Sequence, residues 1–294
     1  MFSSKLRTRA QVLATVVTGI ILYIHKYHNN VLVTHVLRRR IRAQNRNMLN
    51  TLRHMDIHYI TSDDIPSEFK GRIQIIHISE WNRIKSRRQR CETIMEEIKR
   101  TRVRRITSDC VVFDVIEASG AYFPSMHTDT EWNLVRNKGF QIWCLEYNIN
   151  ASRLGNMFLF HNEYLRRRYK GIYYYIRQHG DNVYVIRNCT HSEHLLTGKP
   201  LPQHVLEVIP VDTFVTQTRM FYLDIYPNEC LVFDRDVLHM SDYRDRSLNR
   251  KSFNFRVAYK KDGKLRYSQS SCGYVNCLST HIHKPRSPGM YDLI

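Results

Sequence analysis

Hydrophobic residues in the last two thirds of the chain form short runs that are separated by turn-forming residues. The runs are rich in Val, Ile, Tyr and Phe, and they follow one another too closely to leave room for the helical crossovers of a parallel sheet. Many short strands without intervening helices are typical of a β-sandwich or jelly roll. The pattern therefore predicts a mainly β (α+β) fold, a double-stranded β-helix or jelly roll with flanking N-terminal helices. The predicted strands are Val111–Ile116, Tyr122–Asp129, Phe140–Tyr147, Met157–Phe160, Asn182–Ile186, His204–Val208, Met220–Ile225, Cys230–Phe233, Ser252–Tyr259 and Leu265–Ser268.

Before these strands the pattern is helical. Between Ser79 and Ile106, apolar residues recur at the spacing of one helix face, while arginines and lysines occupy the other faces. The pattern predicts an amphipathic helix that packs on the sheet, and a solvated basic face is favoured over one that binds nucleic acid or membrane. Residues 163–177, with their charges and tyrosines, predict an inserted helix or hairpin. Loops near 163–180 and 190–202 are expected to form a lid that selects the substrate.

The N-terminus contains an uncharged apolar stretch, Gln11–Ile24, with basic residues on both sides. A helix that crosses a bilayer needs about 20 apolar residues, so this stretch is short. We expect an N-terminal membrane anchor, with a cytosolic packing helix as the alternative. The predicted location is accordingly membrane-associated through a single N-terminal anchor, and otherwise cytoplasmic. Sequons at Asn150 and Asn188 add little weight for a lumenal domain.

Length and charge suggest how the chain is organised. Its 294 residues, 43% of them hydrophobic, suit one catalytic domain with a lead segment. The expected parts are an anchor over residues 1–30, a basic helical lead region over 31–108 and a jelly-roll domain over 109–294. The net charge is +18, and residues 1–105 hold 22 basic against 8 acidic residues. A basic leading third beside a nearly neutral remainder indicates a positioning segment, for which an anionic membrane surface fits and nucleic acid is not favoured.

The seven cysteines are scattered and form no CxxC pair. Because seven is odd, at least one cysteine has no partner within the chain. Cys144 and Cys230 lie in apolar runs, where we expect them to be small buried hydrophobic residues and not metal ligands.

Candidate chemistry begins with His127-Thr128-Asp129 at the end of an apolar run. In an extended strand, residues two apart project from the same face, so the imidazole and the carboxylate can reach one ion together. A distant apolar run, residues 229–239, ends in His239. Two histidines and one carboxylate form the facial triad of non-haem Fe(II) oxygenases, which leaves coordination positions open. The sequence therefore predicts that His127, Asp129 and His239 bind Fe(II) as the catalytic metal centre.

The open positions of such a centre suit 2-oxoglutarate and O₂ as cosubstrates. The far carboxylate of 2-oxoglutarate needs a cation, and Arg250 lies eleven residues after His239, on the next predicted strand. The planar guanidinium matches a carboxylate with two hydrogen bonds. Ser252 shares that strand face and could donate a hydrogen bond to the same group. Arg256 has the same parity as Arg250 and is the weaker alternative anchor.

The chain resembles a known family over about residues 110–260. The segments MHTDTEW, FQIWCLEYN, GNMFLF, ECLVFDRDVLHMSD and RKSFNFRVAY resemble the phytanoyl-CoA dioxygenase family in order and spacing. The resemblance implies the same iron ligands and Arg250 as the 2-oxoglutarate anchor. It also implies that Trp143, the tryptophan of the second segment, lies near the cosubstrate or in the core. Asn162–Gly180 replaces the family's glycine- and proline-rich segment, so the resemblance does not carry an acyl-CoA substrate over to this chain.

The predicted function is an Fe(II)- and 2-oxoglutarate-dependent dioxygenase that hydroxylates a C–H bond of a small-molecule or lipid substrate and releases succinate and CO₂. The alternative is a catalytically inactive jelly roll that serves as a basic adaptor at membranes or nucleic acid. The histidine pairs at 191 and 194 and at 281 and 283 lie in polar segments without further ligands, so we expect solvated side chains there. Substrate identity and oligomeric state do not follow from the sequence.

Overall fold

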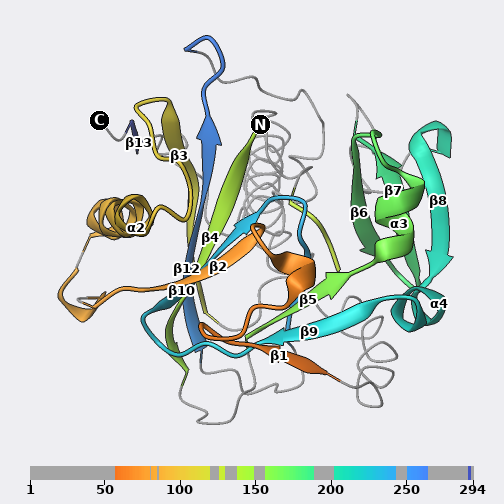
Figure 1. The fold of residues 1–294 in the computed structure, drawn as a ribbon, viewed down its shortest axis with the longest axis horizontal. Helices are drawn as coiled ribbons and strands as arrows, with labels where there is room; N and C mark the ends of the chain where they lie inside the picture. The colour runs from red at the N-terminus through yellow and green to blue at the C-terminus, as the bar shows by residue number, and fades with distance from the viewer. Residues whose placement is uncertain are drawn as a thin grey trace, which may run out of the picture.

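The computed structural model describes residues 57–79, 81–84, 86–119, 126–129, 138–148, 156–188, 202–242, 250–263 and 291–292. These residues form three β-sheets with a few short helices (Figure 1). Helix α2 (Arg87–Thr101) lies at one side of the molecule, and the smallest sheet lies at the other with α3 (Glu163–Arg168) and α4 (Val211–Thr216). The predicted mainly β, jelly-roll fold with a flanking helix is confirmed.

The largest sheet has six strands, and its paired strands are all antiparallel. Its two long inner strands pair over most of their length, which gives the sheet a continuous centre. The order is β13 (Tyr291–Asp292), β3 (Cys110–Ser119), β12 (Arg250–Tyr259), β4 (Gly139–Asn148), β10 (Glu229–Asp234) and β2 (Ile73–His77).

The second sheet has four strands and packs on the largest sheet through a buried apolar layer. Alternate residues of each strand face this layer, for example Trp143 and Leu145 from the large sheet and Leu159 and Phe221 from the small one. This buried layer explains why apolar and polar residues alternate along some strands, while other strands are apolar throughout. The order is β1 (His58–Ile60), β9 (Arg219–Leu223), β5 (Met157–His161) and β11 (Leu238–Ser241), and β1 runs parallel to β9.

The predicted amphipathic helix is confirmed as α2, which covers the outer face of the large sheet. Its buried face carries Cys91, Ile94, Met95 and Ile98, which join one core cluster with residues of β4, β10 and β12. The helix begins after Ser86, whose hydroxyl accepts a hydrogen bond from the Gln89 N–H at 3.1 Å. This cap satisfies one of the free N–H groups of the first turn.

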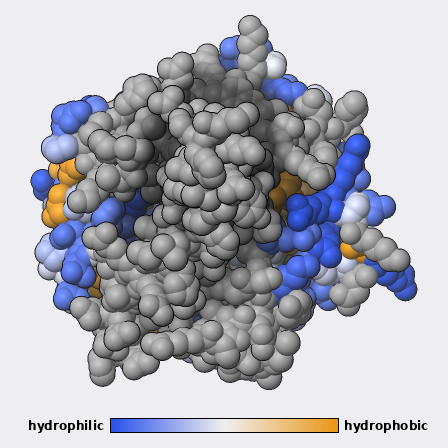
Figure 2. Space-filling model, turned by 180° about the vertical axis from the view of Figure 1, so that it is seen from behind, coloured by the Kyte–Doolittle hydropathy of each residue, from blue (hydrophilic) through white to orange (hydrophobic). Residues whose placement is uncertain are grey.

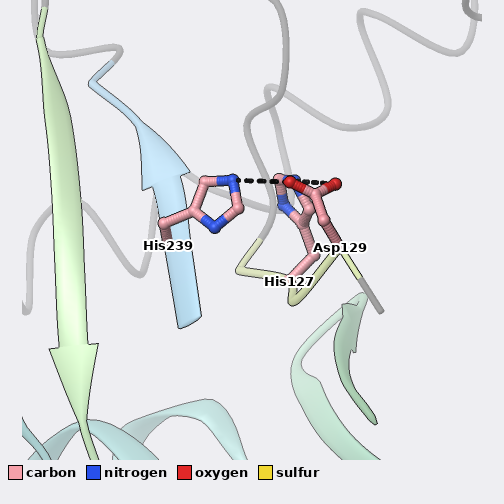
Figure 3. A group of neighbouring side chains, drawn as sticks. All are labelled: His127, Asp129 and His239. Carbon is pink, nitrogen blue, oxygen red and sulfur yellow. Dashed lines mark ion pairs between the residues drawn. The ribbon is translucent and has the colours of Figure 1, made fainter. Parts of the chain in front are cut away.

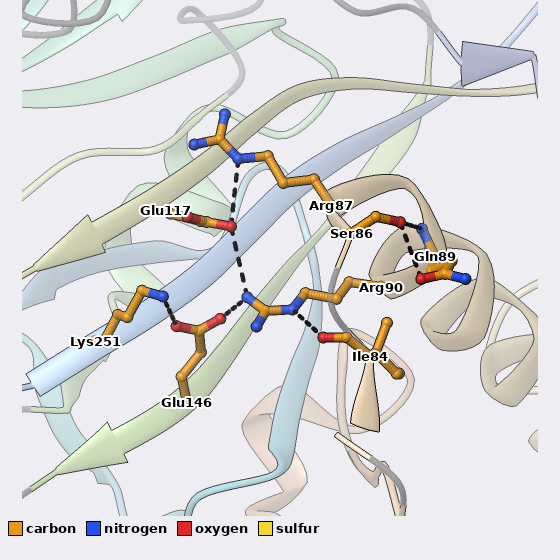
Figure 4. Close-up of polar contacts among 8 residues, drawn as sticks. All are labelled: Ile84, Ser86, Arg87, Gln89, Arg90, Glu117, Glu146 and Lys251. Atoms are coloured by element: carbon orange, nitrogen blue, oxygen red, sulfur yellow. Dashed lines mark hydrogen bonds and ion pairs between the residues drawn. The ribbon is translucent and has the colours of Figure 1, made fainter. Parts of the chain in front are cut away.

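Two arginines of α2 join the helix to the sheet by ionic contacts, and the first, Arg87, lies 3.3 Å from Glu117. Arg90 contacts the carboxylates of Glu146 and Glu117, and Lys251 contacts Glu146 at 2.8 Å (Figure 4). The guanidinium of Arg90 also lies over the ring of Trp81, 5.0 Å from the ring centroid. Part of the predicted basic surface of the helix therefore binds the protein's own sheet.

The third sheet follows from the segment predicted as an inserted helix or hairpin. Asn162 caps α3, because its side-chain oxygen accepts a hydrogen bond from the Leu165 N–H at 2.9 Å. Three strands follow in a meander, in which the middle strand pairs with the other two. Its order is β6 (Tyr174–His179), β7 (Asn182–Arg187) and β8 (Val205–Pro210). Short 3-10 helices lie at Ser67–Phe69, Trp81–Arg83 and Pro202–His204. The lid function of residues 163–180 stays a prediction.

The described part of the lead region 31–108 differs from the helical expectation. Besides α2 it contributes β1 and β2, which pair with β9 and β10 respectively. These segments are short and β1 has only one buried residue, so their strand pattern is weak in sequence. The expected boundaries at residues 30 and 108 stay predictions.

The predicted membrane anchor, Gln11–Ile24, lies outside the described residues. In the described ranges no helix is long and apolar enough to cross a bilayer. The longest helix there, α2, has 15 residues and carries many charges, whereas a span needs about 20 apolar residues. This finding contradicts the predicted membrane-associated location.

Cys144 and Cys230 are fully buried, as expected, but they are joined in a disulfide. The sequence pattern did not predict this bond. The two residues lie directly opposite each other on β4 and β10, where the Cβ atoms of cross-strand partners come close together. Cys91 and Cys110 are free and buried.

Candidate metal centre

The predicted site residues come from two segments that lie side by side. Residues 126–129 run beside β11, and His127 and His239 exchange backbone hydrogen bonds of 3.0 Å in both directions. On the other side, the Thr128 N–H donates to the carbonyl of Ile176 at 3.0 Å. The backbone that carries His127 and Asp129 is thus held from both sides.

These backbone bonds bring the side chains of His127, Asp129 and His239 together (Figure 3). One potential ligand atom from each residue lies within 4.8 Å of the other two. The Nε2 atom of His239 is 3.4 Å from Oδ2 of Asp129, and Nε2 of His127 is 3.9 Å from Oδ1. All three residues are buried. The arrangement is what two imidazoles and a carboxylate need to bind one metal ion.

The ring of His239 is oriented so that one nitrogen is left for a metal. Its Nδ1 lies 2.9 Å from the carbonyl oxygen of Val237. A carbonyl only accepts, so Nδ1 carries the proton and donates, which leaves the lone pair on Nε2. Burial lowers the pKa of His239, against the opposing effect of Asp129. A neutral imidazole, the form that binds metals, is therefore favoured.

Asp129 is held by two neighbours as well as by the histidines. Arg256 donates from Nη2 to Oδ1 at 3.1 Å, and the amide of Gln141 donates to Oδ2. Burial by itself would raise the pKa of this carboxyl, but Arg256, the two histidines and the Gln141 hydrogen bond outweigh it and hold the pKa well below its ordinary value. Asp129 is consequently ionised at neutral pH, as a metal ligand would need to be.

The neighbouring strands β4 and β12 turn a shared face toward this group. Ser252 pairs with Leu145 and Arg256 with Gln141, and directly opposite residues project from the same side of a sheet. Ser252 therefore shares a face with Arg256, which contacts Asp129. Its hydroxyl is fully buried and has no hydrogen-bond partner among the described residues.

The other two predicted residues are placed less directly. Arg250 begins β12, and its side chain lies outside the described residues. Trp143 is buried in the apolar layer between the two larger sheets, where it packs with Leu231 and Phe233. This position agrees with either of the two environments that the resemblance implies.

Gln141 was missed by the sequence analysis, and Arg256 was assigned only a minor role. Gln141 precedes Trp143 by two residues in β4, so strand alternation could have placed it on the same inward face. No sequence signal indicates that Arg256 contacts Asp129, because the two residues are 127 positions apart. His191, His194, His281 and His283 lie outside the described residues.

The donor set fits a divalent transition metal. Imidazole nitrogens suit iron, zinc, copper and nickel, and a set of two histidines with one carboxylate is the facial arrangement used by non-haem Fe(II) sites. The Val237 carbonyl accepts a hydrogen bond from His239, and the Gln141 amide donates one to Asp129; hydrogen bonds of this kind orient metal ligands. Within the described residues this is the group of His, Cys, Asp and Glu side chains that could hold a metal ion.

Comparisons with known proteins found no matching family model and no matching curated protein. Among solved structures, this chain is similar to a putative alpha-ketoglutarate-dependent taurine dioxygenase from Burkholderia xenovorans, with 12% identity and a TM-score of 0.35 over 66% of this chain and 80% of that one. It is also similar to SnoK, a non-heme alpha-ketoglutarate-dependent carbocyclase from nogalamycin biosynthesis, with 12% identity and a TM-score of 0.34 over 81% and 78%.

A third similar structure is the apo form of the non-heme monooxygenase ThoJ, with 11% identity and a TM-score of 0.30. The match covers 61% of this chain and spans only 59% of the length of ThoJ. The fold of this chain is assigned from its own sheet topology. Membership of the phytanoyl-CoA dioxygenase family stays a prediction.

Proposed function

We propose that this protein is a non-haem Fe(II)- and 2-oxoglutarate-dependent oxygenase. The observation that supports the proposal most is the buried convergence of His127, Asp129 and His239, with one ligand atom each inside a 4.8 Å radius of the others. Two imidazoles and one carboxylate form a donor set that suits Fe(II) and leaves positions open for other ligands.

The chain's own residues would bind and orient the reactants. His127, Asp129 and His239 hold the metal, while Gln141 and Arg256 keep the carboxylate ionised and in place. When bound, the iron supplies the oxidative chemistry with 2-oxoglutarate and O₂, and the products are succinate, CO₂ and an oxidised substrate. The buried apolar layer beside the site excludes water from it.

For the cosubstrate we retain Arg250 as the cation that binds the far carboxylate of 2-oxoglutarate. The buried hydroxyl of Ser252 would donate a hydrogen bond to the same carboxylate, and Trp143 would contact the cosubstrate from the neighbouring strand. The finer assignment, a relative of the phytanoyl-CoA dioxygenases that hydroxylates a C–H bond of a small organic or lipid substrate, rests on the sequence resemblance.

The first test is whether the protein assembles the ternary centre. Purified full-length chain, mixed anaerobically with Fe(II) and 2-oxoglutarate, is expected to develop the visible metal-to-ligand charge-transfer band of this class of site. His127→Ala should abolish the band by removing a ligand. His77→Ala, which removes an exposed histidine from β2, is the matched control and should leave the band intact.

The same samples in air test turnover. We expect wild-type protein to convert 2-oxoglutarate into succinate, uncoupled from any added substrate, and His127→Ala to lose this conversion. Absence of both the band and the succinate in folded wild-type protein would refute the oxygenase proposal. That result would favour the predicted alternative, a catalytically inactive jelly roll. In such a protein Asp129 and both histidines would have only a structural role.

A further inference from the structure

A cavity of about 230 Å³ lies where β5 runs into α3, beside β6 and the turn that leads into β11. Its wall includes residues from Phe160 to Ile176 and, from distant parts of the chain, Arg72 and Asp236. The volume is a little below the ~300–1,000 Å³ of pockets that hold drug-sized ligands. A smaller organic molecule would therefore fit.

The cavity is separate from the candidate metal centre, although the same backbone borders both. Thr128 and Leu238 line the cavity, whereas their sequence neighbours His127, Asp129 and His239 do not. In extended backbone, adjacent residues project to opposite sides. The metal ligands and the cavity thus lie on opposite sides of these two segments.

The polar part of the wall carries a net positive charge. The guanidinium of Arg166 forms no hydrogen bond or ion pair with any residue in the described ranges, and Arg72 is paired with Asp236 at 2.9 Å. His161 is buried, its Nε2 lies 3.1 Å from Glu163, and its Nδ1 has no partner among the described residues. Burial lowers the pKa of His161, and Arg166 and Arg72 lower it further. Among the described residues that line the cavity, the positive charge of Arg166 is therefore not compensated.

Apart from Thr128 and Asn162, the remaining described residues of the wall are apolar or aromatic. Phe160, Leu165 and Ile176 belong to a buried core cluster, and Tyr174 packs against it. Ile172 and Tyr173 also line the cavity, although 39% and 57% of their surfaces are exposed. Exposed large hydrophobic residues are few in the described chain, and the described part of the surface visible in Figure 2 is mostly hydrophilic. Adjacent exposed apolar residues beside a cavity are typical of a binding site.

We propose that this cavity is a second ligand site, which binds a small amphipathic monoanion, a carboxylic acid with a hydrocarbon body. The acid group would bind toward Arg166 and Arg72, and the hydrocarbon would pack on Phe160, Leu165 and Ile176. Arg166, whose guanidinium has no partner among the described residues, would supply a charge-assisted hydrogen bond, and the apolar wall residues would supply the hydrophobic contribution. The proposal concerns binding to the metal-free protein and does not rest on the oxygenase function.

Titration calorimetry of full-length, metal-free protein with octanoate as the probe tests the proposal. We expect saturable binding of octanoate, and binding of uncharged octan-1-ol that is about tenfold weaker, a factor that corresponds to one charge-assisted contact. Arg166→Gln should weaken octanoate binding by about the same factor and leave octan-1-ol binding unchanged. Arg166 is exposed and has no side-chain partner in the described chain, so this variant keeps its fold.

Lys170→Gln is the matched control, because it removes the same charge from an exposed residue that does not line the cavity. It should bind octanoate as wild type does. The proposal fails if octanoate does not bind, or if Arg166→Gln and Lys170→Gln bind it equally. Inorganic phosphate that binds as tightly as octanoate would refute the amphipathic ligand and indicate a simple anion site. Success or failure here leaves the charge-transfer test of the metal centre unaffected.

Discussion

At the scale of single residues, Asp129 is the position on which the candidate site depends. It is buried, and a buried carboxylate stays ionised only if opposite charges or hydrogen bonds stabilise it. Arg256 and Gln141 do so from strands β12 and β4. Its lowered pKa means that Asp129 contributes to stability above the ordinary carboxyl pKa. This contribution is lost as the pH falls through that range toward the lower pKa of the folded protein.

Arg256→Met should therefore destabilise the metal-free protein. The substitution keeps an unbranched side chain in the interior but leaves Asp129 buried without its guanidinium partner, and breaking such a pair costs about 3–5 kcal/mol. The pKa of Asp129 should rise, because burial then acts with less opposition. The free energy of unfolding in urea measures the loss. Arg256→Lys keeps the charge and should lose less, whereas equal losses for both variants would show that packing, not charge, matters at this position.

At the scale of elements, helix α2 is attached to the large sheet by two different interactions. Its apolar face packs on the sheet, and Arg90 reaches the carboxylates of Glu146 and Glu117. The side chain of Arg90 is only 15% exposed, so solvent screens these contacts less than it screens contacts on the outer face of the helix. The outer face has its own pair, Arg88 with Glu92 at 2.7 Å, whose arginine is 63% exposed.

Arg90 and Arg88 should therefore differ in their contribution to stability. We expect Arg90→Met to lower the free energy of unfolding by about 2 kcal/mol, less than for a fully unpaired buried charge because Lys251 still contacts Glu146. Arg88→Met, the matched control, should change it by no more than about 0.5 kcal/mol. Chemical denaturation of the two variants beside wild type measures the difference. Similar losses would contradict the assigned role of Arg90.

At the scale of the whole molecule, the Cys144–Cys230 disulfide joins two central strands across a sequence separation of 86 residues. A bond that closes so long a loop reduces the conformational freedom of the unfolded chain, by about 4 kcal/mol in the chain-entropy model. The strands β4 and β10 also carry residues of the interior face, among them Gln141 and Trp143. The bond thus stabilises the sheet that borders the candidate metal centre.

Replacing both cysteines by alanine should lower the midpoint of denaturation, with a loss of stability of about 4 kcal/mol under oxidising conditions. Under reducing conditions that open the bond in the unfolded chain, wild type and variant should differ much less. Peptide mapping of unreduced wild-type protein should find the peptides of Cys144 and Cys230 linked. Recovery of both as alkylated single peptides would contradict the bond, and the stability comparison would then report only the loss of two buried sulfurs.

Several features of this protein follow from local sequence patterns alone. Alternation and apolar runs predicted the strands β3, β4, β5, β7, β8, β9, β10 and β12, because side chains of a strand alternate between a buried and an outer face. Helical spacing predicted α2 through the residues it buries, Cys91, Ile94, Met95 and Ile98. His127 and Asp129, two residues apart, were predicted to share one ion with His239, and the three side chains do converge. Iron binding itself stays a prediction.

Other features depend on contacts between residues that are far apart in the chain, and a local pattern carries no information on them. Short strands such as β1, β6 and β11 exist because a neighbouring strand supplies their hydrogen bonds. The pairing of Cys144 with Cys230 required the register of β4 against β10, and the contacts of Arg256 and Gln141 with Asp129 required the packing of two sheets. The sequence alone determined which apolar residues of the strands and of α2 are buried and which residues could bind a metal, since both follow from side-chain chemistry and local periodicity. Only the tertiary structure decided which of them meet, because strand register and sheet packing set the distances between side chains.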